Sequence, residues 1–143
     1  MAIITPGYTA GFIDEYSKGT HNLDADIFKL ALYNDSVTLG LATTAYSATN
    51  EASGTGYSAG GVAMTLASGY PSQDAATGIK SYRFNTVTWP GATFGARAGL
   101  MYNSSKSNKS VMVLDFGALR SVTASTFSVA FPTTLPPIIT IRG

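Results

Sequence analysis

The sequence has no cysteine, which excludes a disulfide scaffold and any metal site built on thiolate ligands. A chain without cysteine also fits the reducing environment of a cytoplasm. Charge is scarce as well, because 12% of the residues are charged, against roughly 25% in an average soluble domain. Such a surface lacks the repulsion that keeps monomers apart, so we expect it to contact copies of the chain or a larger assembly.

Several classes of partner are excluded by what else is missing. The net charge of +1 provides no electrostatic footprint for nucleic acid or for an anionic membrane. No apolar run approaches the roughly 20 residues that a transmembrane helix needs. The N-terminus has no basic segment followed by a long apolar stretch, so no secretory signal is expected. We therefore expect neither nucleic acid nor a membrane among the partners.

Two apolar runs in the last third of the chain form the centre of the predicted fold. Residues 111–116 are apolar on both faces, with Val111 and Val113 on the same side, which indicates a strand covered front and back. Residues 126–131 alternate between apolar and polar, which indicates one dry and one wetter face. We expect the two runs to be neighbouring strands of an antiparallel sheet.

Further strands are predicted where apolar residues alternate between turn-forming stretches. They span residues 28–33, 62–67, 82–89, 96–102 and 138–141. A bulge or kink is expected near Asn85 and Thr86, where the phase of the pattern changes. The run 96–102 is expected to form a hairpin with the run that begins at residue 111.

These patterns predict an all-β fold, namely an antiparallel β-sandwich or jelly roll with one short N-terminal helix. Residues 37–56 are interpreted as an ordered surface loop, because their small side chains cannot build a core. Residues 1–18 are expected to form an arm and the helix, ahead of a single sandwich domain over residues 19–143. Thr5-Pro6 is the candidate start of the helix, and Gly19 its candidate end.

The arm and the helix are the expected surface for partner contact, because a terminal arm can reach a neighbouring subunit. Apolar side chains recur in the helix at helical spacing and form a stripe along one side. The residues assigned to this contact are Ile3, Ile4, Tyr8, Phe12 and Tyr16.

No motif in the chain supports catalysis. The stretch 56–60 matches the G-x-S-x-G pattern of a nucleophile elbow, but an alternating strand follows it where a helix is required. The single histidine, His21, lies upstream and lacks the convergent partners that a general base or a metal site needs. We predict no catalytic residue and no cofactor, and we expect that the protein is not an enzyme.

Two binding sites can be imagined, and both have simpler explanations. Asp14, Glu15, Asp24 and Asp26 lack the spacing and the glycine of a calcium-binding loop, so we interpret them as solvated carboxylates and predict no metal. Trp89 with Tyr82 and Phe84 could form a sugar-binding platform. Aromatic residues in strands are more often core residues, because each buries a large apolar area.

Four stretches, taken in order, carry a resemblance to a known family. They are residues 19–22 with 28–33 (GTHN and FKLALY), 43–46 with 49–51 (TTAY and TNE), 54–61 (GTGYSAGG), and 96–97 with 102–106 (AR and YNSSK) followed by 113–117 (VLDFG). Together they are similar to a family of small virion proteins of tailed bacteriophages. The resemblance covers most of the chain from residue 19 onward.

The resemblance implies a non-enzymatic structural component of a phage particle, assembled in the cytoplasm of the bacterial host. The favoured role is a capsid cement or decoration protein on the capsid surface. Its expected partners are the major capsid protein and copies of itself, in a homo-oligomer for which a trimer is one option. The alternatives are a structural protein of the tail, collar or fibre base and, second, a carbohydrate-binding module.

Overall fold

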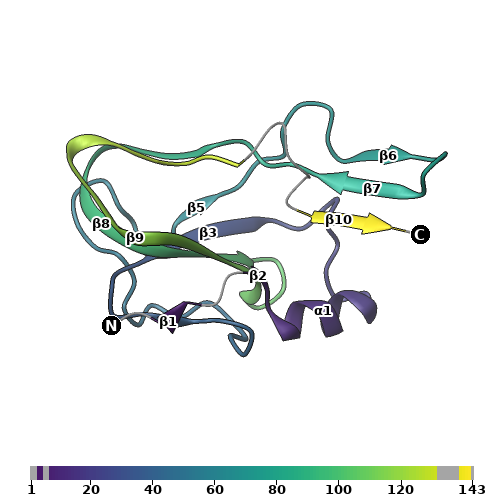
Figure 1. Ribbon diagram of the computed structural model, residues 1–143, viewed down its shortest axis with the longest axis horizontal. Helices are drawn as coiled ribbons and strands as arrows, with labels where there is room; N and C mark the ends of the chain where they lie inside the picture. Colours follow the sequence, from purple (N-terminus) through teal and green to yellow (C-terminus); the bar gives the residue numbers. More distant parts are fainter. Residues whose placement is uncertain (1–2, 5–6, 132–138, 143) are drawn as a thin grey trace.

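The computed structural model describes residues 3–4, 7–131 and 139–142, and strands dominate it (Figure 1). In chain order the described elements are β1 (Ile3–Ile4), β2 (Gly7–Tyr8), α1 (Ala10–Ser17), β3 (Phe28–Tyr33), β4 (Thr38–Leu39), β5 (Val62–Ala63), β6 (Ser72–Asp74), β7 (Ile79–Tyr82), β8 (Val87–Asn103), β9 (Lys109–Val129) and β10 (Ile139–Arg142). The prediction of an all-β fold with one short N-terminal helix is confirmed.

The largest sheet has the strand order β2-β9-β8-β3-β5, and its pairings are antiparallel. Strands β10, β7 and β6 form a smaller antiparallel sheet, and β1 pairs in parallel with β4. The hairpin of β8 and β9 is the longest element of the protein and includes the pairing predicted between runs 96–102 and 111–116.

The β8–β9 hairpin folds back over itself, and this bend creates the two layers of the fold (Figure 1). At the bend, β8 advances from Ala96 to Ala98 while β9 spans Asp115 to Arg120, so β9 carries extra residues. Gly117 lies among them with a φ of 78°, a conformation that a glycine adopts without strain. We call residues 109–115 of β9 its lower arm and residues 120–129 its upper arm.

This bend corrects the predicted relation between the two central runs. Residues 111–116 and 126–129 are not neighbouring strands, because both belong to β9 and lie on opposite sides of its bend. The pattern of alternation identified the extended segments correctly. It could not reveal that a glycine-containing bulge, rather than a chain reversal, joins them.

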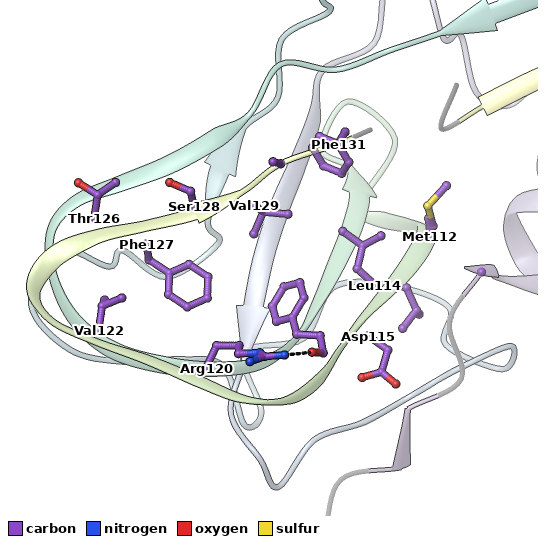
Figure 2. Close-up of a pocket in the computed structure, with 14 residues that line it drawn as sticks. Met112, Leu114, Asp115, Arg120, Val122, Thr126, Phe127, Ser128, Val129 and Phe131 are labelled. Carbon is purple, nitrogen blue, oxygen red and sulfur yellow. Dashed lines mark hydrogen bonds between the residues drawn. The ribbon is translucent and has the colours of Figure 1, made fainter. Parts of the chain in front are cut away.

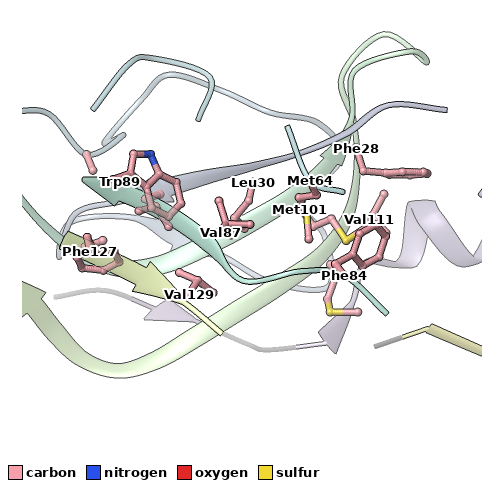
Figure 3. Close-up of a cluster of buried hydrophobic side chains, with 14 of the residues drawn as sticks. Phe28, Leu30, Met64, Phe84, Val87, Trp89, Met101, Val111, Phe127 and Val129 are labelled. Atoms are coloured by element: carbon pink, nitrogen blue, oxygen red, sulfur yellow. The ribbon is translucent and has the colours of Figure 1, made fainter. Parts of the chain in front are cut away.

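The core fills the space between the two layers (Figure 3). Leu30 of β3 and Met101 of β8 contribute from the lower layer, while Trp89 and Phe127 contribute from the upper layer. Phe127 lies 5.0 Å from Phe94 and 6.0 Å from Trp89, measured between ring centroids. Burial of these large side chains supplies the main driving force for stacking the layers.

A second cluster covers the opposite face of the lower layer and includes Val113, Val37 and Leu39. The last two lie in the stretch 37–56, so the interpretation of this stretch as unable to build a core is wrong for its first residues. The lower arm of β9 is thus covered on both faces, as predicted. A register shift between Met101 and Tyr102 places Val111 in the first cluster and Val113 in the second, so these two valines do not share a face.

Other boundaries differ from the expected ones by small amounts. Helix α1 begins after Thr9, whose Oγ1 accepts a hydrogen bond from the backbone N–H of Phe12 at 3.3 Å. This is the arrangement of an N-cap, so the prediction that the helix starts at Thr5-Pro6 is wrong. Thr5 and Pro6 themselves lie outside the described residues. Gly19 follows the helix with a φ of 74°, which fits the predicted C-terminal cap.

The strands after residue 60 also differ in extent. Strand β5 ends at Ala63, and Leu66 forms an isolated bridge with Phe84 where a longer strand was predicted. A bulge or kink was expected near Asn85, where the alternation of apolar residues changes phase. The structure instead has a break between the end of β7 at Tyr82 and the start of β8 at Val87. Strand β10 begins at Ile139, and residue 138 of the predicted last strand lies outside the described residues.

Candidate functional site

The five residues expected to contact a partner do not share one environment. Phe12 is 5% exposed and belongs to the core, where its ring lies 5.0 Å from the ring of His21. Tyr8 and Tyr16 are half-buried and pack against the same cluster, and Ile4 packs against the second cluster. Ile3 is 64% exposed. Of the five, Ile3 is the residue best placed to meet a partner, whereas Phe12 serves the fold of the protein itself.

Two further exposed apolar side chains, Leu41 and Ile13, are linked to the N-terminal segment that carries Ile3. Leu41 is 59% exposed and lines the same shallow groove as Ile3. Its carbonyl oxygen accepts a hydrogen bond from the N–H of Ala10 at 2.9 Å, which ties it to the start of α1. Ile13 is 57% exposed and lies one helical turn after Ala10. We call Ile3, Ile13 and Leu41 the N-terminal patch.

Sequence reasoning missed Leu41 because it lies in a stretch of small residues interpreted as a loop. The available signal was that Leu41 is a large apolar residue flanked by glycine and alanine. Side chains of that kind in a loop either anchor the loop in the core or remain exposed, and the pattern alone does not distinguish the two.

His21 lies at the centre of a polar network under the turn that joins β8 to β9. Its side chain is buried, and its two ring nitrogens lie 3.0 Å from Glu15 Oε2 and 3.0 Å from Asn103 Nδ2. Asn103 also donates from Nδ2 to Asp26 Oδ2 at 2.7 Å, and its Oδ1 accepts from the N–H of Ser105. A flipped amide would place its oxygen against the Asp26 carboxylate, so the amide orientation is determined.

This orientation also determines the proton position on His21. Because Asn103 donates to Nδ1, the neutral ring carries its proton on Nε2 and donates it to Glu15. Lys109 of β9 donates to the other oxygen of Glu15. Partial burial raises the pKa of Glu15, but the hydrogen bonds from Lys109 and His21 outweigh it and hold the pKa below its ordinary value. The network joins α1 to the β8–β9 turn.

The four acidic residues considered as a metal site are bonded to cationic or polar side chains. Asp14 pairs with Lys18 at 2.6 Å, and Asp24 bonds to Lys80 at 2.8 Å and to Tyr82 at 2.9 Å. The hydrogen bonds from Lys80 and then Tyr82 lower the pKa of Asp24. Within residues 3–4, 7–131 and 139–142, no group of three or more histidine or carboxylate side chains is placed to hold a metal ion.

The stretch 56–60 forms turns rather than a nucleophile elbow. Gly56 and Gly60 have φ values of 83° and 90°, and the carbonyl oxygen of Ser58 accepts a hydrogen bond from the N–H of Gly61. Gly61 itself lies against β3, where an added Cβ would meet the carbonyl oxygen of Leu30 at 1.8 Å. The glycines are therefore explained by close backbone approach.

Glu51 organises this loop, and the sequence carries no signal that predicts its role. Its carboxylate accepts hydrogen bonds from Tyr46, Tyr57 and the N–H of Gly60, each at 2.7 Å. Burial, followed by the hydrogen bond to Glu51, raises the pKa of Tyr46 to about 12. The loop is thus fixed to the lower layer by buried hydroxyl groups that remain protonated at neutral pH.

The three aromatic residues considered as a sugar platform are buried in the core. Trp89 is 2% exposed, and Tyr82 and Phe84 are also buried members of the same cluster. A sugar platform presents ring faces to solvent, and these rings do not. Their arrangement therefore supports the core interpretation.

An apolar groove lies between the two arms of β9 (Figure 2). It encloses about 710 Å³. Apolar side chains from both arms line it, namely Met112, Leu114, Phe116, Val122, Phe127, Val129 and Phe131. Asp115 and Arg120 lie at its rim in the bend, where Arg120 donates to the carbonyl oxygen of Phe116 at 3.4 Å.

Comparison of the chain with protein-family models, with curated proteins and with solved structures finds no match. In the part of the chain that the structure describes, no helix is long and apolar enough to cross a membrane.

Proposed function

We propose that this protein is a structural component of a bacteriophage virion and that it acts as a capsid cement or decoration protein. The observation that carries the proposal is the N-terminal patch, whose three large apolar side chains are each more than half exposed. Single exposed apolar residues are ordinary, but Ile3 and Leu41 line one groove, and exposure grouped in this way fits a contact surface.

Two other features support a structural role. The low charge of the chain removes a barrier to close packing against neighbouring subunits. The polar networks around His21 and Glu51 are partly buried and hold elements together, so their side chains are occupied in maintaining the fold. The resemblance to small virion proteins of tailed phages is consistent with these features.

The proposed mechanism is linkage between binding and shell stability. The N-terminal patch docks at junctions between major capsid proteins, and the protein associates with copies of itself around them. A protein that binds the assembled, expanded shell but does not bind the free capsid subunits lowers the free energy of the shell relative to the free subunits by mass action. Apolar contact at the patch provides the binding energy.

The test uses purified particles of the phage that encodes the chain. Deleting residues 1–18 is a poor test, because it also removes Phe12 from the core. We instead expect the triple variant Ile3→Ser, Ile13→Ser and Leu41→Ser to stay folded and to lose occupancy on particles. Leu119→Ser is the matched control, because Leu119 is an exposed apolar residue in the bend of β9, outside the patch.

The copy number per particle distinguishes the possible placements. On the order of hundreds of copies indicates a repeating position on the shell, whereas on the order of ten indicates the tail, the collar or the fibre base. Unchanged occupancy of the triple variant, or absence of the protein from particles, would overturn the proposal.

A further inference from the structure

Among the residues that the structure describes, the upper arm of β9 has an edge with no partner strand; we call it the open edge. Strand β9 pairs with β8 on one side and with β2 on the other, but β2 covers only Val113 and Met112. Thr9, Thr44 and Ala45 also bond to the lower arm, but no described strand pairs with this side of the upper arm. Unpaired N–H and C=O groups along such an edge form a template for a further strand.

The open edge lacks the features that usually protect an edge strand. From Ser121 to Phe131 the sequence contains no charged residue and no proline. A bulge at Ala124, where φ is 46°, interrupts the upper arm and limits its regular part to the residues that follow. The open segment is therefore Ser125 to Phe131, in which Ser125 to Val129 belong to β9 and Ala130 and Phe131 follow it. Pro132 comes next in the sequence without a backbone N–H.

The same segment forms one wall of the apolar groove. Figure 2 shows Phe127 and Val129 directed toward the lower arm, while Thr126 and Ser128 lie on the outer side of the strand. Apolar side chains from both layers line the groove, and Leu114, Val122 and Phe131 among them are only partly buried. An extended strand laid along this edge would use the free backbone groups and cover the groove at the same time.

We propose that the occupant is a second copy of this chain, with the two open segments paired antiparallel about a two-fold axis. In such a symmetric pair the two-fold axis must pass through the same residue of both copies. Side chains that point into the groove in one copy then lie opposite groove-facing side chains of the other. For the segment Ser125 to Phe131 the centre is Ser128, which places Phe127 of one copy opposite Val129 of the other. Aromatic and β-branched pairs of this kind stabilise antiparallel sheets.

The charge distribution favours a second copy as the occupant. Two uncharged segments approach without repulsion, whereas a partner selected by charge would find no charged group between Ser121 and Phe131. Asp115 and Arg120 lie in the bend, outside the paired segment. The arrangement is isologous and produces a dimer, in place of the trimer considered from the sequence. It does not depend on the proposed role in a virion.

Charge placed at the two-fold axis provides a specific test. Ser128 is exposed, so Ser128→Lys and Ser128→Glu are both expected to fold normally, as checked by circular dichroism. Each variant places like charges opposite each other, and we expect a rise of roughly tenfold or more in the dimer dissociation constant. An equimolar mixture of the two variants should associate again as a heterodimer. Sedimentation equilibrium over a concentration series measures the association of each variant and of their mixture.

The matched control is Ala118→Lys, which adds the same charge to an exposed position in the bend of β9. We expect it to dimerise like the unmodified chain. The proposal is overturned if the unmodified chain stays monomeric across the series, if Ala118→Lys weakens association as much as Ser128→Lys, or if the mixture fails to restore it. A trimer that is insensitive to both lysine variants overturns it as well.

Discussion

The two arms of β9 belong to one continuous strand, yet they are held in different ways. The lower arm has a strand on each side, core clusters on both faces and Lys109 anchored to Glu15. The upper arm has β8 on one side and an open edge on the other. Its attachment to the lower layer depends on the inward side chains Phe127 and Val129.

This difference shows that polar interactions stabilise one end of the hairpin and apolar interactions stabilise the other. Near the β8–β9 turn, directional hydrogen bonds fix the relative positions of α1 and the strands. Beyond the bend, burial of aromatic rings holds the layers together without fixing the outer edge. Substitutions in the two arms should therefore have different consequences.

The largest effect is expected from Phe127→Ala in the upper arm. The ring of Phe127 lies near those of Trp89, Phe94 and Phe116, and its removal leaves a cavity between the layers. We expect the free energy of unfolding to fall by about 3 kcal/mol or more, measured by urea denaturation. Leu119→Ala, an exposed position in the bend, should change it by less than about 0.5 kcal/mol. Equal effects at the two positions would refute the idea that aromatic burial holds the upper arm.

An intermediate effect is expected from Asn103→Ala near the turn. The substitution removes both hydrogen bonds from Nδ2, so the buried Nδ1 of His21 loses its donor and Asp26 loses one of its donors. We expect a loss of about 2 kcal/mol in the free energy of unfolding, against less than about 1 kcal/mol for the neighbouring Ser104→Ala. The nitrogen chemical shifts of His21 provide a second measurement. They should report the Nε2–H tautomer in the unmodified chain and a mixture of tautomers in the variant.

The smallest effect is expected from Glu15→Gln, and it depends on pH. Because the pKa of Glu15 is below its ordinary value of 4.5 in the folded state, its carboxylate stabilises the fold above that pH. This contribution is lost as the pH falls through the lowered pKa. The unmodified chain should therefore lose more stability between neutral and acidic pH than the glutamine variant does. Parallel pH profiles of the urea midpoint would show that Glu15 contributes nothing to the acid response.

Alternation of apolar residues predicted the extended segments well, because a strand repeats every two residues and its buried side must be apolar. The run 28–33 is strand β3 as expected, and the hairpin between β8 and β9 has the predicted partners. The helix was predictable because apolar residues recur at helical spacing and Gly19 follows the helix as its C-terminal cap. These features depend on neighbouring residues in the chain.

The functional surfaces were less predictable, since they depend on residues that are distant in sequence. Phe12 and Ile13 are adjacent in α1, yet one is buried against the core and the other is exposed. Leu41 reaches the same side of the molecule through a backbone hydrogen bond to Ala10. The groove between the arms of β9 arises from the bend, for which the sequence shows only a glycine and a run of small residues.

The sequence by itself determined that this chain is built of strands, carries little charge and has one short helix at its start. The local periods of apolar residues and the composition are sufficient for these conclusions. Only the tertiary structure decided that β9 bends back over itself, that His21 and Glu51 are occupied within partly buried networks, and that one edge of β9 remains open. These outcomes depend on which distant segments meet, and the free energy of those contacts is not encoded in any single stretch of the chain.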